Sequence, residues 1–141
     1  MYSLRDKIVF ITGASSGIGQ SCARAFAAQG AKVLMCARRV ERIAAVAEEL
    51  KQECGVAAHA FQLDVRDQPA VEKVLTSLPP EWEAIEVLVN NAGLSRGLDK
   101  LHEGQIEDWE EMIDTNVKGL LYVSRAVIPG AISCRLATTP L

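Results

Sequence analysis

The sequence has few aromatic residues, only two histidines and no long apolar run. Aromatic residues make up 5% of the 141 positions, and no His/Cys spacing typical of zinc occurs, so we expect no metal site. No segment is apolar for long enough to span a bilayer, and the N-terminus does not resemble a signal peptide. The net charge is -3, whereas proteins that bind nucleic acid or anionic membranes usually carry an excess of basic residues.

Closely spaced cysteines are also absent. The four cysteines form no Cys-x-x-Cys pair, and three of them lie in apolar or helical stretches, which favours buried, reduced thiols over disulfides. Apolar residues make up 49% of the chain and charged residues 23%, a balance typical of a soluble globular domain. We therefore expect a cytoplasmic protein that works without nucleic acid and without a membrane.

Short apolar strands alternate with amphipathic helices along most of the chain. Strands are expected at residues 7–12, 32–37, 59–63 and 85–89, and helices at 18–29, 40–52, after an N-cap at Asp67, and at 106–128. This βαβαβαβα order predicts an α/β fold, a Rossmann-type doubly wound parallel sheet with helices on both faces. The last predicted helix carries an apolar stripe that comprises Ile106, Trp109, Ile113, Val117, Leu120, Leu121 and Ile128.

The alternation stops after about four βα units. A fifth strand is due within residues 131–141, and no clear one is present. We therefore predict an incomplete Rossmann-type domain over residues 1–130, followed by an atypical tail over residues 131–141. In the doubly wound order the fourth strand lies beside the first and the absent fifth. We expect strand 85–89 to keep an open edge and the domain to be weakly stable.

A glycine pattern joins the first strand to the first helix. Gly13 permits a tight turn, Gly17 lets the backbone approach a phosphate, and Gly19 lets the helix pack closely on the strand. Ser15 and Ile18 lie in the same turn. The helix N-terminus adds N–H donors and a positive dipole end, so the pattern predicts a pyrophosphate site. A P-loop is excluded because no Gly-Lys-Ser/Thr follows the turn.

The second strand ends without an acidic residue. A carboxylate there would bind the ribose 2′-hydroxyl of NAD and repel a 2′-phosphate. Instead Arg38 and Arg39 occupy this position, and guanidinium groups suit phosphate. The sequence therefore favours NADP over NAD. In the alternative interpretation, both arginines only solvate the start of the next helix, where a cation is unfavourable.

Four motifs in this order resemble the short-chain dehydrogenase/reductase family in its classical form. They are Thr12-Gly13-x-x-x-Gly17-x-Gly19, Asp64-Val65, Asn90-Asn91-Ala92-Gly93 and Asn116, and the resemblance covers residues from about 7 to 129. It implies that the Asp64 carboxylate accepts from the adenine amino group and that Val65 lies against the ring. The alternative role for Asp64, a helix N-cap, is already filled by Asp67.

The resemblance also assigns roles to the asparagines. Asn90, Ala92 and Gly93 belong to the cofactor site on the nicotinamide side, and Asn91 steadies the sheet; an ordinary asparagine-rich turn is the alternative. Asn116 lies within the apolar stripe of the long predicted helix. It either holds a water of a proton relay, as the resemblance implies, or is a buried amide satisfied for structural reasons.

The resemblance implies an oxidoreductase that moves hydride between NADP(H) and a small hydroxy acid or carbonyl compound. Residues 91–97 and 98–102 resemble the branch that acts on serine and other 3-hydroxy acids. Family members use a Tyr-x-x-x-Lys pair and a serine, but Tyr2 and Tyr122 are followed four positions later by Asp6 and Ala126. We expect this chain alone to be inactive. The alternative is an NADP-binding fragment or an interaction partner of an intact, homo-oligomeric relative.

Overall fold

Four parallel strands form the centre of the structure, a computed structural model that describes residues 3–138. They are β1 (Ile8–Thr12), β2 (Lys32–Ala37), β3 (Ala58–Gln62) and β4 (Ile85–Val89). Their order in the sheet is β3-β2-β1-β4, and every pair is parallel. The Rossmann-type α/β fold predicted from the sequence is confirmed, and the predicted strands agree with the observed ones to within one residue.

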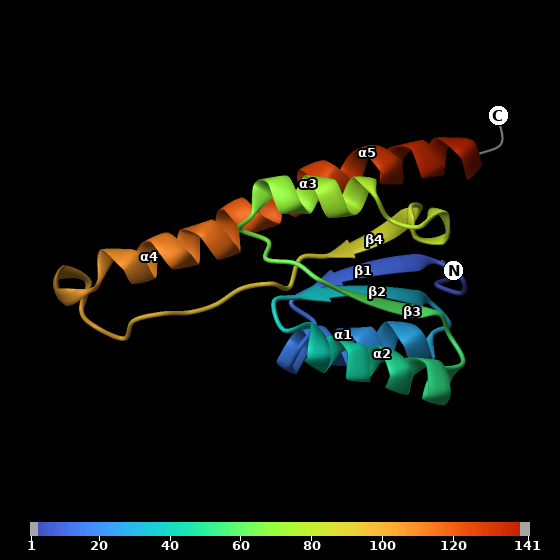
Figure 1. Cartoon of the computed structure of the whole chain (residues 1–141), viewed down its shortest axis with the longest axis horizontal. Helices are drawn as coiled ribbons and strands as arrows, with labels where there is room; N and C mark the ends of the chain where they lie inside the picture. The colour runs from blue at the N-terminus through green and yellow to red at the C-terminus, as the bar shows by residue number, and fades with distance from the viewer. Residues whose placement is uncertain (1–2, 139–141) are drawn as a thin grey trace.

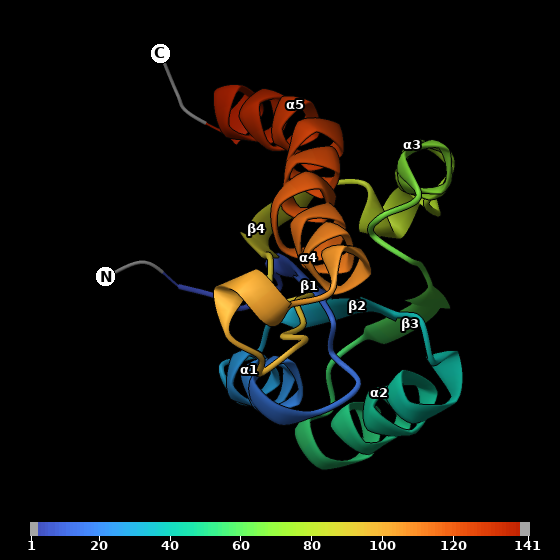
Figure 2. The same ribbon diagram turned by 90° about the vertical axis from the view of Figure 1, so that its left-hand side faces the viewer.

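Helices cover both faces of this sheet (Figures 1 and 2). Helices α1 (Gly17–Ala28) and α2 (Val40–Cys54) lie on one face, and α3 (Gln68–Thr76) and α5 (Leu120–Thr138) lie on the other. Successive strand residues point to opposite faces, so Val9 and Ile11 join the core under α1 and α2. Phe10 and Leu34 join the core under α3 and α5. Every residue of β1 is therefore buried.

The helix boundaries follow local chemistry. Asp67 is the N-cap of α3, where its side chain accepts a hydrogen bond from the Ala70 N–H at 3.0 Å, and Pro69 lies in the first turn. Gly55 ends α2 in the left-handed conformation, with φ of 67°. Short 3₁₀ turns at Pro80–Trp82 and Leu101–Glu103 complete the connections.

The long helix predicted for residues 106–128 is not a single α-helix. It begins as α4 (Ile106–Ile113), passes through a π-helical segment at Asp114–Gly119, and continues as α5. Gly119 lies against Val65, where an added Cβ would be 2.6 Å from Cγ2. This close approach turns a different face toward the sheet. The residues of this face that are buried are Thr115, Gly119, Val123 and Val127.

The apolar stripe expected to be buried is therefore mostly exposed. Six of its residues are more than one-third exposed, and only Trp109 is partly buried. Asn116, which the stripe predicted to be buried, is exposed as well. The prediction was wrong after residue 113 because an α-helical period of 3.6 residues does not hold through the π-helical segment. It was wrong for Ile106 and Ile113 because α4 extends beyond the sheet (Figure 1). The exposed residues are Ile106, Ile113, Val117, Leu120, Leu121 and Ile128.

The end of the described chain is helical rather than irregular. Helix α5 continues to Thr138 with Pro129 inside it, so it crosses the proposed boundary after residue 130, and residues 139–141 lie outside the described part. That boundary stays a prediction. Among the described strands β4 pairs only with β1, which confirms the open edge. No described helix has the length and apolar character that crossing a membrane requires.

The cysteine prediction is confirmed in part. Cys36 is buried in β2, and this burial raises the pKa of its thiol to about 12. Cys22 is half-buried. Cys54, by contrast, is exposed at the end of α2. Its place in the last helical turn explains this exposure.

Replacement of the buried Leu34 tests the core between β2 and the α3/α5 layer. Leu34→Ala is expected to lower the free energy of unfolding by about 2–5 kcal/mol, because the side chain is fully buried and leaves a cavity. Urea denaturation followed by circular dichroism measures this change. The matched control is Leu98→Ala in the exposed loop, which should leave the unfolding midpoint nearly unchanged. Equal losses for both variants would contradict the assignment of this core.

Candidate functional site

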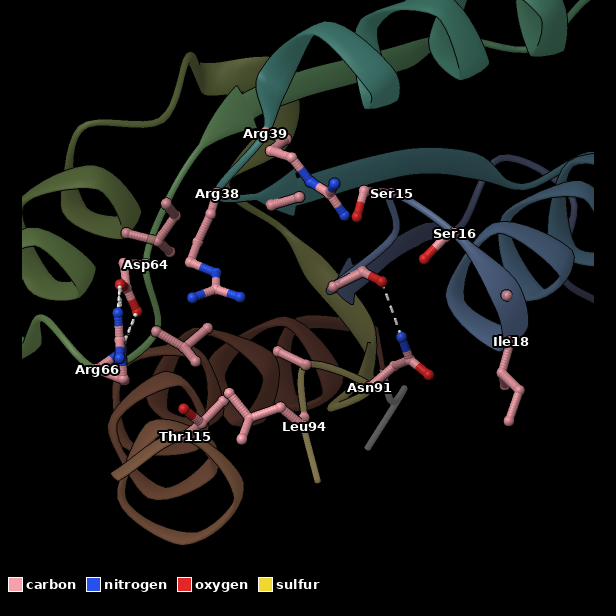
Figure 3. Close-up of a pocket in the computed structure, with 17 residues that line it drawn as sticks. Ser15, Ser16, Ile18, Arg38, Arg39, Asp64, Arg66, Asn91, Leu94 and Thr115 are labelled. Carbon is pink, nitrogen blue, oxygen red and sulfur yellow. Dashed lines mark hydrogen bonds and ion pairs between the residues drawn. The ribbon is translucent and has the colours of Figure 1, made fainter. Parts of the chain in front are cut away.

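A cavity of about 480 Å³ lies at the carboxyl ends of the four strands (Figure 3). This is the edge at which open parallel sheets bind ligands, and the volume is within the range of small-molecule sites. Ten of the residues predicted to bind a cofactor line it. They are Gly13, Ser15, Gly17, Ile18, Arg38, Arg39, Asp64, Val65, Ala92 and Gly93.

The glycine turn is held against its neighbours on both sides. The Gly13 N–H donates to the Cys36 carbonyl at 2.9 Å, and an added Cβ on Gly13 would lie 2.7 Å from the Cα of Ala92. Gly17 differs, because no atom lies within 4 Å of the position its Cβ would take. With φ of 57°, Gly17 presents open backbone to the cavity. The turn therefore leaves room for a ligand at Gly17.

Gly19 was predicted to contact a cofactor, but it does not line the cavity. An added Cβ would lie 2.6 Å from the Gly13 carbonyl oxygen and would also clash with the Asn91 amide nitrogen. Its lack of a side chain therefore lets α1 pack against the two turns. This is the packing role that the glycine pattern itself predicted.

The N-terminus of α1 faces the same cavity and is not neutralised by the chain. Ser16 is the N-cap residue, but its side chain makes no capping hydrogen bond, and no acidic residue lies in the first turn. The free N–H groups and the positive end of the helix dipole are open to an anion. Ser16 was missed by the sequence analysis, although its place before Gly17 could have identified it.

The turn after β4 is tied to the turn after β1. The Thr12 hydroxyl accepts hydrogen bonds from the N–H groups of Asn91 at 3.1 Å and Ala92 at 3.0 Å. The Asn91 side-chain amide donates to the Gly13 carbonyl at 3.0 Å. These bonds fix the distance between the two turns that form one wall of the cavity. Asn91 also lines the cavity, which the sequence analysis did not predict.

Asn90 is not part of the cavity wall. Its side-chain amide donates to the Ser124 hydroxyl of α5 at 3.0 Å, and its Oδ1 is buried with no partner. Successive residues at a strand end point to opposite faces, so Asn91 faces the glycine turn and Asn90 faces α5. The predicted cofactor contact from Asn90 is therefore not supported by its position.

Asn116 clamps the chain that follows β4. Its Oδ1 accepts from the Leu94 N–H at 2.9 Å, and its Nδ2 donates to the Leu94 carbonyl at 2.8 Å. Asn116 itself does not line the cavity, but its neighbour Thr115 and its partner Leu94 do. Both the oxygen and the nitrogen of the side-chain amide are therefore hydrogen-bonded, although the residue is exposed. Its expected role in a proton relay stays a prediction.

Three arginines and one acid, which are Arg38, Arg39, Arg66 and Asp64, line another part of the cavity. In Figure 3 Arg38 points into the cavity, while Arg39 points toward the glycine turn. Arg66, which the sequence analysis missed, holds the Asp64 carboxylate with Nη2 to Oδ2 at 2.7 Å and Nε to Oδ1 at 3.0 Å. The Arg66 guanidinium lowers the pKa of Asp64 below its ordinary value. Asp64 is therefore ionised and oriented.

Thr115 supplies a second polar group that the sequence analysis missed. The residue lines the cavity, while its Oγ1 is buried and has no hydrogen-bond partner among the described residues. An open glycine, an uncapped helix N-terminus and two arginines together fit a phosphate-bearing nucleotide. No group of three metal-ligating side chains occurs among the described residues.

Comparison with known proteins identifies the family of this chain. The model of the family described as short chain dehydrogenase matches residues 7–135. The chain belongs to this family. The chain is 51% identical over 125 residues to the NADP-dependent 3-hydroxy acid dehydrogenase YdfG of Escherichia coli O6:H1, a match that covers 89% of this chain and 49% of that protein. It therefore spans about half the length of the curated short-chain dehydrogenases it matches.

Two solved structures that contain a cofactor have a similar fold. One is the closed form of a serine dehydrogenase complexed with NADP+, at 50% identity and a TM-score of 0.80, with 89% of this chain and 49% of that chain covered. The other is an alcohol dehydrogenase of Thermococcus sibiricus complexed with 5-hydroxy-NADP, at 35% identity and a TM-score of 0.87. That match covers 92% of this chain and 55% of the other.

The ion pair between Asp64 and Arg66 gives a prediction for pH dependence. Arg66→Gln should raise the pKa of Asp64 toward its ordinary value, because the cation that favours the carboxylate is removed. In the native chain the folded pKa is depressed, so the stabilisation is present above the unfolded pKa and is lost as pH falls through the folded pKa. NMR titration of the Asp64 carboxyl carbon measures the shift. An unchanged titration curve would show that Arg66 does not control this carboxylate.

Proposed function

We propose that this chain binds NADP(H) in the cavity at the strand ends. We further propose that it supplies the cofactor-binding half of an oxidoreductase. That enzyme would move hydride between NADP(H) and a small hydroxy acid or carbonyl compound. The observation that carries the proposal is the pair Arg38 and Arg39 on the cavity wall, beside the glycine turn and without an acid at the end of β2. The NADP complexes of the relatives support it.

Each part of the cavity suits one part of the cofactor. The glycine turn and the N-terminus of α1 would hold the pyrophosphate, because they offer free N–H groups and no acidic side chain. Arg38, Arg39 and Ser15 would hold the 2′-phosphate. Bound NADP(H) supplies or accepts the hydride. The protein's own contribution is to bind the phosphates and to fix the ribose and base.

The remaining groups would position the two ends of the cofactor. Asp64 would accept from the adenine amino group, and Val65 would offer an apolar surface to the ring; both residues line the cavity. Ala92 and Gly93 would contact the ribose on the nicotinamide side, where the Asn116 clamp holds Leu94. Ala92 has a small side chain and Gly93 has none, so a ribose can approach the backbone closely at these two residues.

Hydride transfer to a carbonyl also requires a proton donor. Neither tyrosine in these 141 residues precedes a lysine by four positions, so we infer that the chain alone binds cofactor but does not turn over substrate. The 3-hydroxy acid class rests on the names of the relatives and on the resemblance of residues 91–102. NADP is the cofactor we infer, with NAD bound more weakly.

A second candidate function is an inactive NADP-binding partner of an intact relative. The observation that favours it is the exposed apolar face that includes Val117, Leu121 and Ile128, together with the open edge of β4. Monomeric proteins rarely leave such a contiguous face uncovered. This candidate still requires the cofactor site, so both candidates share the tests below.

Replacement of the two arginines tests the 2′-phosphate site. Arg38→Gln and Arg39→Gln should each weaken NADPH binding by about tenfold, since each removes a charge-assisted contact to phosphate. NADH binding should change little because NADH lacks that phosphate. Titrations followed by nicotinamide fluorescence measure both affinities. Equal NADPH and NADH affinities in the unaltered chain would contradict the proposed cofactor preference.

Two glycines of matched geometry test the pyrophosphate site. Gly17→Asp should abolish NADPH binding, because a side chain and a negative charge enter the space left for phosphate. Gly55→Asp is the control, since Gly55 also has a positive φ and no atom within 4 Å of its Cβ position but lies outside the cavity. Both variants carry similar backbone strain. If both lose NADPH binding equally, strain rather than the site explains the loss.

A further inference from the structure

Glu111 on α4 contacts three arginines that come from three other segments of the chain. Its Oε2 lies 3.0 Å from Arg96 Nε in the loop after β4. Its Oε1 lies 3.5 Å from Arg66 Nη1 after β3 and 4.0 Å from Arg38 Nη1 after β2. The Glu111 side chain is 23% exposed, so solvent screens it less than a surface acid. None of the sequence motifs identifies this residue.

The three contacts differ in strength. Arg96 and Arg66 hold the carboxylate at shorter distances, whereas Arg38 is 57% exposed and only just within ion-pair distance. An exposed pair of this length is weak and exchanges readily. Glu111 therefore keeps two partners when Arg38 moves to another anion. Arg66 and Arg38 both line the cavity, but Arg66 also pairs with Asp64 at 2.7 Å, whereas the long contact with Glu111 is the one ion pair found for Arg38 among the described residues.

We propose that Glu111 is a specificity-determining residue of the cofactor site, whose carboxylate competes with the 2′-phosphate of NADP(H) for Arg38. The inference rests on the proposed function. NAD(H) has no 2′-phosphate, so it can bind while Arg38 stays paired with Glu111. The competition therefore weakens the binding of NADP(H) and not that of NAD(H). Glu111 thus lowers the preference for NADP(H) that Arg38 creates.

The test is the ratio of NADPH to NADH affinity in Glu111→Gln, measured by nicotinamide fluorescence. Glutamine keeps the shape of the side chain and an acceptor for Arg96, but removes the charge. NADPH should bind about fivefold more tightly, as expected for one unit charge removed at this distance in a solvated site, while NADH binding stays nearly constant. Glu110→Gln is the matched control, because it makes the same charge change at the next position, where no ion pair to a described arginine occurs.

A double variant separates competition from simple repulsion. In Arg38→Gln the further change Glu111→Gln should leave NADPH affinity unchanged, because the arginine for which the two anions compete is gone. A gain of the same size in both backgrounds would overturn the proposal, since it would show direct repulsion. If Glu111→Gln does not fold, Glu111→Asp withdraws the carboxylate from Arg38 and should raise the ratio in the same direction.

The outcomes also distinguish this inference from the proposed function. If the unaltered chain does not bind NADPH, the proposed function fails. If it binds NADPH and Glu111→Gln leaves the ratio of affinities unchanged, the inference fails while the proposed function stands. A change of equal size in Glu110→Gln also overturns the inference, because net charge alone would then explain the effect.

Discussion

The Thr12 hydroxyl joins the ends of two neighbouring strands, and the position of the cavity depends on this junction. It accepts hydrogen bonds from the backbone N–H groups of Asn91 and Ala92, and the Asn91 side-chain amide donates to the Gly13 carbonyl. The two turns are then so close that no Cβ fits at Gly13. One wall of the site is thereby built from backbone. The glycine turn can therefore present its N–H groups to a ligand instead of shielding them with side chains.

The same constraint orients α1. Gly19 lets the helix approach both turns, which aims the helix N-terminus into the cavity. The first turn lacks an acid, so the chain leaves the positive end of the dipole for a ligand. Arg38 and Arg39 add charge on the neighbouring strand end. The helix dipole of α1 and the guanidinium groups at the end of β2 thus converge on the region where we propose that the cofactor phosphates bind.

Short sequence patterns predicted the strands, the glycine turn and the helix start that together form much of this site. The strands are short apolar runs, and the glycine spacing, the arginine pair and the N-cap at Asp67 each depend on only a few neighbouring residues. Long-range packing decided the rest. The buried face from Thr115 to Val127 follows from the π-helical segment and the close approach at Gly119. Glu111 was missed because its three partners lie up to 73 positions away, in segments that only the fold brings together.

The acids that pair with the cavity arginines have two opposing effects on ligand binding. Arginines crowded at one cavity repel one another when no ligand is present, and the Asp64 and Glu111 carboxylates offset that repulsion. The same acids fix the guanidinium groups in place, which lowers the entropic cost of ligand binding. An acid that steadies an arginine also competes with the ligand phosphate. The strong pair at Arg66 favours order, whereas the long pair at Arg38 leaves that arginine free to change partners.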